Sequence, residues 1–279
     1  MADKVEQLLQ STIQHGAYNS RIYLMKLYSR DIPAIFSKMD ELSEKNSYTK
    51  IFTRVPEKLS GFFKDNGYVK EAEIPGFFNS INTAAFMSKF LSPERKKEKK
   101  PEEVKKNIEL AKAKFSSSPA APALPPEFEI SPAVPKDAEE MAEVYKVVFK
   151  TYPFPIHDPE YLKKTMKENI IYFCARTNGK IAALSSAETY ENWQAVEMTD
   201  FATLPDYLGN GLAVHLLFRM EHEMKEKNYI TAYTIARALS PGMNITFSKM
   251  GYNYSGTLVN NTNIFDGIES MNVWYKHLK

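Results

Sequence analysis

The sequence has very little cysteine, since Cys174 is the only one among its 279 residues. A disulfide bond within the chain is therefore impossible, which fits a reducing compartment, and we expect a cytoplasmic protein. Cys174 lies in the apolar run IIYFCAR. We interpret it as a buried strand residue and not as a nucleophile, because buried free cysteine behaves as a small hydrophobic side chain.

Long apolar runs and a charge imbalance are also missing. No run approaches the roughly 18–20 residues of a membrane-spanning helix, and the first ten residues lack the pattern of a signal peptide. The 36 basic residues are nearly balanced by 34 acidic ones. We therefore expect no nucleic-acid or membrane partner. His157, His215 and the other three histidines show no metal-ligand spacing, so we expect no metal.

The apolar content is sufficient for a folded core, because 43% of the residues are hydrophobic. The composition changes near residue 92, where a charged run is followed by a proline-rich stretch. We predict an N-terminal domain at 1–92, a linker at 93–130 with a helix around 104–115, and a C-terminal domain at 131–279. The charged run is either a solvated spacer or a docking patch for an acidic partner. Its interleaved acids favour the spacer.

The C-terminal part alternates helical and strand patterns. Its order predicts an α/β (α+β) fold with a mixed sheet and helices on both sides. Asn178-Gly179 joins two strand patterns and is a strong hairpin signal. The amphipathic run after Gly211 predicts a helix to about residue 227.

The first half repeats the end of the second. KNSYTKIFTRV (45–55) is similar to KNYITAYTIAR (227–237), and two later segments recur in the same order. We interpret this as a degenerate half-copy of the C-terminal fold, with chance similarity as the alternative. The copy has no Gly-x-Gly between its strands, so we expect it to be structural or to form one wall of the site.

The stretch TLPDYLGNGLA lies between a predicted strand and a predicted helix. Gly209 and Gly211 permit a tight turn, and the amides of residues 208–213 are expected to be free at a helix N-terminus. Such a turn is a ready anion site, although Gly-x-Gly is also typical of a plain turn. It is not a Walker loop, and Val214 stands where a dinucleotide fingerprint needs its third glycine.

The order strand, Pro, Gly-x-Gly, helix, strand, short helix and Gly-aromatic resembles the GNAT family of acetyl-coenzyme A-dependent N-acetyltransferases over about residues 132–279. The resemblance implies a GNAT fold with acetyl-CoA as co-substrate. Asp206 and Leu208 depart from the family, which usually has Arg or Gln at the first position and Arg at the second. The residues implied in coenzyme binding are Phe201, Ala202, Thr203, Leu204, Leu208, Gly209, Asn210, Gly211, Leu212, Ala213, Asn244 and Phe247.

A closer resemblance covers the whole chain. EMTDFATLPDYLGNGLA, YTIARALSPGMNITFSKMGY and ESMNVWYKHL are similar to a branch of the family that has an added N-terminal domain and acetylates β-lysine. This implies a small diamino acid acceptor and a product, Nε-acetyl-β-lysine, that serves as a compatible solute under salt stress. The alternatives are another small amine, a protein lysine, a catalytically inactive coenzyme A sensor, or a scaffold with an ordinary turn. The oligomeric state stays open.

Acetyl transfer to an alkylammonium group requires a base, because only the neutral amine attacks a thioester. Glu197 lies twelve residues before Gly209, where GNAT relatives often have the catalytic glutamate, and we predict it to be the base. Asp200 is the second acid on the strand. A β-bulge, which the resemblance implies, brings both acids to one site and aims the amide of Phe201 or Ala202 at the thioester oxygen.

β-Lysine has one carboxylate and two ammonium groups, so its site needs a cation and an acid. We predict that Arg237 binds the carboxylate, and the alternative is that it holds a helix end or a surface acid. Glu188, Glu269 and Asp200 are the candidates for the unreacting ammonium group. Phe247 replaces the tyrosine that protonates the thiolate in many relatives, which leaves Tyr233, Tyr252 or water for that step.

Overall fold

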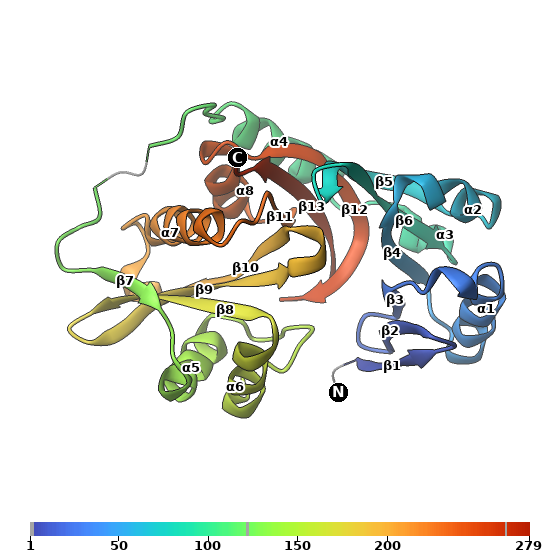
Figure 1. The fold of residues 1–279 in the computed structure, drawn as a ribbon, viewed down its shortest axis with the longest axis horizontal. Coiled ribbons are helices and arrows are strands. Elements are labelled where there is room, and N and C mark those ends of the chain that lie inside the picture. Colours follow the sequence, from blue (N-terminus) through green and yellow to red (C-terminus); the bar gives the residue numbers. More distant parts are fainter. Residues whose placement is uncertain (1–2, 121–122, 266) are drawn as a thin grey trace.

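The computed structural model describes residues 3–120, 123–265 and 267–279 of the chain, and these residues form two mixed β-sheets that lie side by side (Figure 1). Among the described residues, no helix is long and apolar enough to cross a membrane. Cys174 is buried and unbonded, as expected, and burial raises the pKa of its thiol to about 12.

The C-terminal sheet has seven strands in the order β12-β13-β11-β10-β9-β8-β7. Helices α5 and α6 cover one face, and α7 and α8 cover the other (Figure 1), which confirms the predicted mixed α/β class. Each layer is joined to the sheet by its own apolar cluster. The elements are β7 (Glu129–Pro132), α5 (Ala138–Val148), α6 (Pro159–Glu168), β8 (Ile170–Thr177), β9 (Lys180–Tyr190), β10 (Ala195–Thr203), α7 (Leu212–Glu226), β11 (Thr231–Arg237), α8 (Pro241–Lys249), β12 (Asn253–Ile264) and β13 (Gly267–His277).

The N-terminal sheet has six strands in the order β1-β2-β3-β4-β6-β5. The pair β3 and β4 is parallel, as are β10 and β11, and in both sheets one helix connects the two parallel strands. The elements are β1 (Lys4–Leu8), β2 (Ser11–Gly16), β3 (Arg21–Lys26), α1 (Ala34–Asn46), β4 (Lys50–Pro56), α2 (Ser60–Asp65), β5 (Val69–Phe78) and β6 (Asn82–Phe90).

The strand registers confirm the internal repeat. One row across the first sheet runs through Val5, Gln14, Tyr23 and Phe52. The corresponding row across the second sheet runs through Ile170, Glu188, Glu197 and Tyr233. The sequence alignment of 45–55 with 227–237 is wrong by one residue. It equates Phe52 with Thr234, whereas the strand registers make Phe52 equivalent to Tyr233. A slip of one residue exchanges the two faces of a strand, so only the register identifies equivalent side chains.

The two sheets are joined through β5 and β12. Lys50 is buried and pairs with Glu71 at 2.9 Å, and its Nζ also donates to the carbonyl of Val259 at 2.7 Å. The other oxygen of Glu71 accepts from the amide of Val259 at 2.7 Å. One apolar cluster contains side chains from both sheets, among them Phe52 and Tyr233. The halves therefore share part of one core.

The predicted linker contains two helices, α3 (Pro93–Lys96) and α4 (Pro101–Lys112). The helix begins before the expected residue 104, at a proline, which is favourable in the first turn. The solvated-spacer interpretation of the charged run 92–106 is wrong for Arg95, and Asn107, just after the run, is buried as well. Arg95 is buried and donates to the carbonyls of Asn260 and Asn19, and Asn107 donates to the carbonyl of Ala238. The domain boundaries themselves stay a prediction.

Candidate active site

Strands β10 and β11 pair over three positions and then separate. Their register runs from Ala195 to Glu197 on β10, opposite Thr231 to Tyr233 on β11. Just beyond, β10 has the predicted bulge, because its register with β9 shifts after Thr199 and Asp200 has a φ of 55°. The chain thus opens a wedge inside the sheet, where part of the β10 backbone has no partner on β11 among the described residues.

The glycine loop lies between the end of β10 and the start of α7. Gly209 and Gly211 have φ values of 89° and 68°, and a side chain at Gly209 would meet nothing within 4 Å. Within the described residues, the amides from Gly209 to Ala213 make no hydrogen bond, whereas that of Leu208 donates to Pro205. The expectation of free amides is therefore wrong for Leu208 alone. The remaining amides are free at a helix N-terminus, an arrangement that suits an anion.

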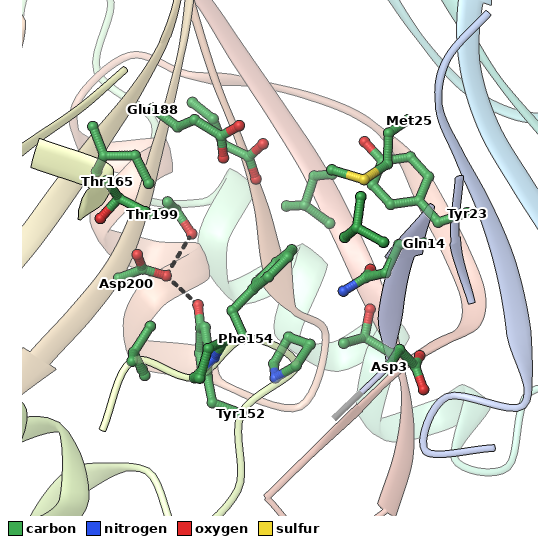
Figure 2. Close-up of a pocket in the computed structure, with 18 of the residues that line it drawn as sticks. Asp3, Gln14, Tyr23, Met25, Tyr152, Phe154, Thr165, Glu188, Thr199 and Asp200 are labelled. Carbon is green, nitrogen blue, oxygen red and sulfur yellow. Dashed lines mark hydrogen bonds between the residues drawn. The ribbon is translucent and has the colours of Figure 1, made fainter. Parts of the chain in front are cut away.

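A cavity of about 460 Å³ lies between the two sheets beside this wedge. It is lined by the equivalent rows, with Gln14 and Tyr23 from one sheet where the other contributes Glu188 and Glu197. Figure 2 shows Gln14 and Tyr23 across the cavity from Glu188 and Asp200. The two sheets repeat the fold but not the charge. Of the two equivalent rows, only the one in the C-terminal sheet contains acids, Glu188 and Glu197.

Glu197 is the acid closest in sequence to the point where the strands separate. Its Oε2 accepts a hydrogen bond of 2.6 Å from the hydroxyl of Tyr233. Burial and the neighbouring Glu188 raise the pKa of Glu197 to about 7, while Tyr233 and Arg54 oppose the rise. A carboxyl group with a pKa near neutral pH can both take up and release a proton readily.

Arg54 reaches this site from β4 of the N-terminal half. Its guanidinium donates to the hydroxyl of Tyr233, which in turn donates to Glu197. Its central carbon lies 4.5 Å from the ring centroid of Phe77 and 4.7 Å from that of Tyr190. Such rings favour a cation over their faces. The N-terminal half of the chain therefore contacts Tyr233, the hydrogen-bond partner of Glu197.

Asp200 and Glu188 complete the acidic wall. The two oxygens of Asp200 accept from Ser186 at 2.6 Å, from Tyr152, and from Thr199 at 3.3 Å. Burial raises the pKa of Asp200 despite these bonds. Glu188 accepts from Tyr190 at 2.8 Å, and burial raises its pKa too. These two acids and Glu197 thus line the same cavity, and their mutual repulsion favours a cationic ligand.

Comparison with known proteins agrees with this geometry. Residues 139–252 match the model of the Acetyltransferase (GNAT) family. A β-lysine N(6)-acetyltransferase of Methanococcus maripaludis is 42% identical to this chain over 98% of both chains. The chain belongs to the GNAT acetyltransferase family. It is an acetyl-CoA-dependent N-acetyltransferase.

Two further relatives of this GNAT protein cover different shares of the chain. A β-lysine N(6)-acetyltransferase of Methanosarcina mazei is 38% identical over 62% of this chain and 64% of its own. The N-acetyltransferase YodP of Bacillus subtilis is 29% identical over 96% of both chains. The relatives from Methanococcus and Bacillus thus include the N-terminal half.

Two residues predicted to hold the acceptor lie outside the cavity of this GNAT enzyme. Arg237 and Glu269 form a two-point ion pair, with Nε–Oε2 at 3.0 Å and Nη2–Oε1 at 2.8 Å. The guanidinium also lies 4.6 Å from the ring centroid of Phe265. The pair neutralises both charges, so the alternative role weighed for Arg237, an ion pair with an acid, is the one observed. Of the acids proposed for the ammonium group, Glu188 and Asp200 line the cavity.

The predicted coenzyme role of Asn244 requires correction. Its Nδ2 donates to the carbonyls of Arg237 and Ser240, and its Oδ1 accepts from Asn272 and Trp274. All four hydrogen-bonding positions of the amide are occupied, so it stabilises the start of α8 and has none left for a ligand.

The aromatic residues near the wedge are mostly core. Phe247 is 1% exposed and packs edge-on against Phe201 and Tyr252, so it offers the coenzyme little surface. Tyr252 is fully buried, and burial raises its pKa well above the ordinary value. Phe201 lies in the bulge, Ala202 and Thr203 end β10, and Leu204 follows the strand. Their role in pairing with the pantetheine arm stays a prediction.

Sequence reasoning missed the residues that the N-terminal half contributes to this site. Arg21 and Gln14 line the cavity, and Arg54 contacts Tyr233. The repeat indicated that this half has the same fold, but no local pattern marks these positions. Only the packing of one sheet against the other brings them within reach of Glu197.

Proposed function

We propose that this enzyme transfers the acetyl group of acetyl-CoA to the ε-amine of β-lysine and produces Nε-acetyl-β-lysine. The observation that carries the proposal is Glu197, a carboxyl group with a pKa of about 7 in an acidic cavity where β10 and β11 separate. The names of the relatives from Methanococcus and Methanosarcina support β-lysine as the acceptor. The product is proposed to act as a cytoplasmic compatible solute under salt stress.

The glycine loop and the wedge have the features that coenzyme A requires. The free amides from Gly209 to Ala213 are suited to bind the pyrophosphate, since they converge at the positive end of the α7 dipole. The unpaired edge of β10 after the bulge is suited to pair with the amides of the pantetheine arm. Both interactions use backbone groups, so they do not depend on the basic residues that this chain lacks at Asp206 and Leu208.

Glu197 is proposed to take the proton of the reacting ammonium group. An alkylammonium with a pKa near 10.4 is less than about 0.1% neutral at pH 7, so the base must supply the neutral amine. Tyr233 and Arg54 keep the carboxylate in place. The amide of Phe201 or Ala202, at the bulge, is the proposed donor to the thioester oxygen as negative charge develops.

A thiol-release assay with acetyl-CoA tests the proposal. β-Lysine, α-lysine, spermidine and a lysine peptide are compared at equal concentrations. We expect strong turnover with β-lysine alone. Preference for another amine would contradict the named acceptor and leave the chemistry intact, whereas coenzyme A binding with no turnover of any amine would favour the sensor.

A further inference from the structure

Arg21, at the start of β3, is a buried cation that lines the cavity and has no carboxylate partner among the described residues. Arg21 is only 5% exposed. Nη1 donates to the carbonyl of Asn261 at 2.6 Å and lies 3.4 Å from Oγ1 of Thr262. Within the described parts of the chain, its Nε and Nη2 groups make no hydrogen bond.

A buried charge is costly unless a counter-charge or hydrogen bonds compensate it, and two other buried cations of the chain have such partners. Lys50 pairs with Glu71, and Arg95 donates from all three of its nitrogens to oxygen atoms. Arg21 is less well compensated in hydrogen bonds, since among the described residues only its Nη1 donates. Burial lowers the pKa of both buried arginines, to about 10 for Arg21 and about 9 for Arg95.

The cavity surface around Arg21 is partly aromatic. Its guanidinium carbon lies 5.6 Å from the ring centroids of Tyr23 and Phe52, whose faces favour a cation but do not replace the acceptor that its unused N–H groups lack. Asp3 lines the same wall, but both its oxygens accept from Asn19, at 2.6 and 3.4 Å. The unused guanidinium donors therefore suit an anion that the ligand brings.

We propose that Arg21 binds the carboxylate of the acceptor, so that the N-terminal half of the chain forms the subsite for the acidic end of a diamino acid. This inference rests on the proposed function and specifies how the site recognises its substrate. The ligand lies with its carboxylate at Arg21 on one wall and its amines toward Glu188 and Glu197 on the other. A diamine without a carboxylate has no group that can bind to Arg21.

Two substrates that differ only in the carboxylate test the assignment. Pentane-1,4-diamine is β-lysine without its carboxyl group. In Arg21→Met, we expect kcat/KM for β-lysine to fall roughly 10- to 100-fold, which is the range for losing a hydrogen bond to a charged group. The value for the diamine should change by less than about threefold. Arg21→Lys keeps the charge and should show a smaller loss in the same direction.

The ratio of the two kcat/KM values is the quantity compared, because it does not depend on how much of a variant is folded. Arg95→Met is the matched control, since it removes a buried arginine, in the linker, that does not line the cavity. It should leave the ratio unchanged. A variant at Arg21 that also leaves the ratio unchanged would overturn the subsite, as would a wild-type enzyme that prefers the diamine.

Failure of the proposed function gives a different result. If the wild-type enzyme turns over neither compound but acetylates another amine, both the acceptor and the carboxylate subsite are wrong. If it turns over β-lysine and the Arg21 variants lose activity equally with both compounds, the acceptor stands and only the subsite is wrong.

Discussion

Replacing Arg54 by methionine should change the pH dependence of the enzyme although Arg54 lies on the opposite half of the chain from Glu197. The guanidinium donates to Tyr233, which donates to Glu197, and its positive charge opposes the rise in the pKa of that carboxyl group. Loss of a nearby opposite charge makes a carboxylic acid about tenfold weaker. The pKa of Glu197, about 7 in the wild type, therefore moves upward in the variant.

The size of the effect follows from the share of Glu197 that is deprotonated. At pH 7 this share falls from about one half to about one tenth, so kcat/KM should fall roughly fivefold. At pH 9 the carboxylate is largely deprotonated in both proteins, and the difference should shrink to about 10%. The ratio of variant to wild-type kcat/KM is measured from pH 6 to 9.5, because the titration of the substrate amine cancels in it.

The lysine variant is the control for charge. Arg54→Lys keeps a cation among the rings of Phe77 and Tyr190, so its pH profile should stay close to that of the wild type. If Arg54→Met lowers kcat/KM by the same factor at pH 7 and pH 9, the loss comes from distorted packing, and the electrostatic reasoning is refuted.

Three further changes test other parts of the structure. Glu197→Gln should lower kcat by about 10²- to 10⁴-fold with unchanged coenzyme A affinity by calorimetric titration; weaker binding would contradict a role as base. Gly211→Ala forces a side chain onto a φ of 68°, at about 1–3 kcal/mol, and should weaken coenzyme A binding in the same titration; unchanged affinity would argue against the loop as the cradle. Lys50→Met leaves Glu71 buried and unpaired and should cost about 3–5 kcal/mol in urea unfolding, part of which Lys50→Met with Glu71→Met should recover; no recovery would show that the loss does not come from the unpaired acid.

The features that sequence alone determined are local. The hairpin at Asn178-Gly179, the helix after Gly211 and the strand that carries Glu197 all have the predicted type, because each depends on side-chain periodicity and turn chemistry within a few residues. The repeat was also visible, since similar segments recur in the same order. Its register was not, because a one-residue slip barely changes sequence similarity but reverses which side chains face the core.

Tertiary structure decided which charged residues meet in the cavity. Arg237 had a suitable place in the sequence, yet Glu269 from the adjacent strand β13 neutralises it. Arg21 and Arg54 had no distinguishing pattern, yet the packing of the two sheets brings one to the cavity and the other to Tyr233. The contacts of Arg21 with Asn261 and of Arg54 with Tyr233 join positions more than a hundred residues apart in sequence. They depend on how the sheets bury their faces against each other, and no local spacing encodes that choice.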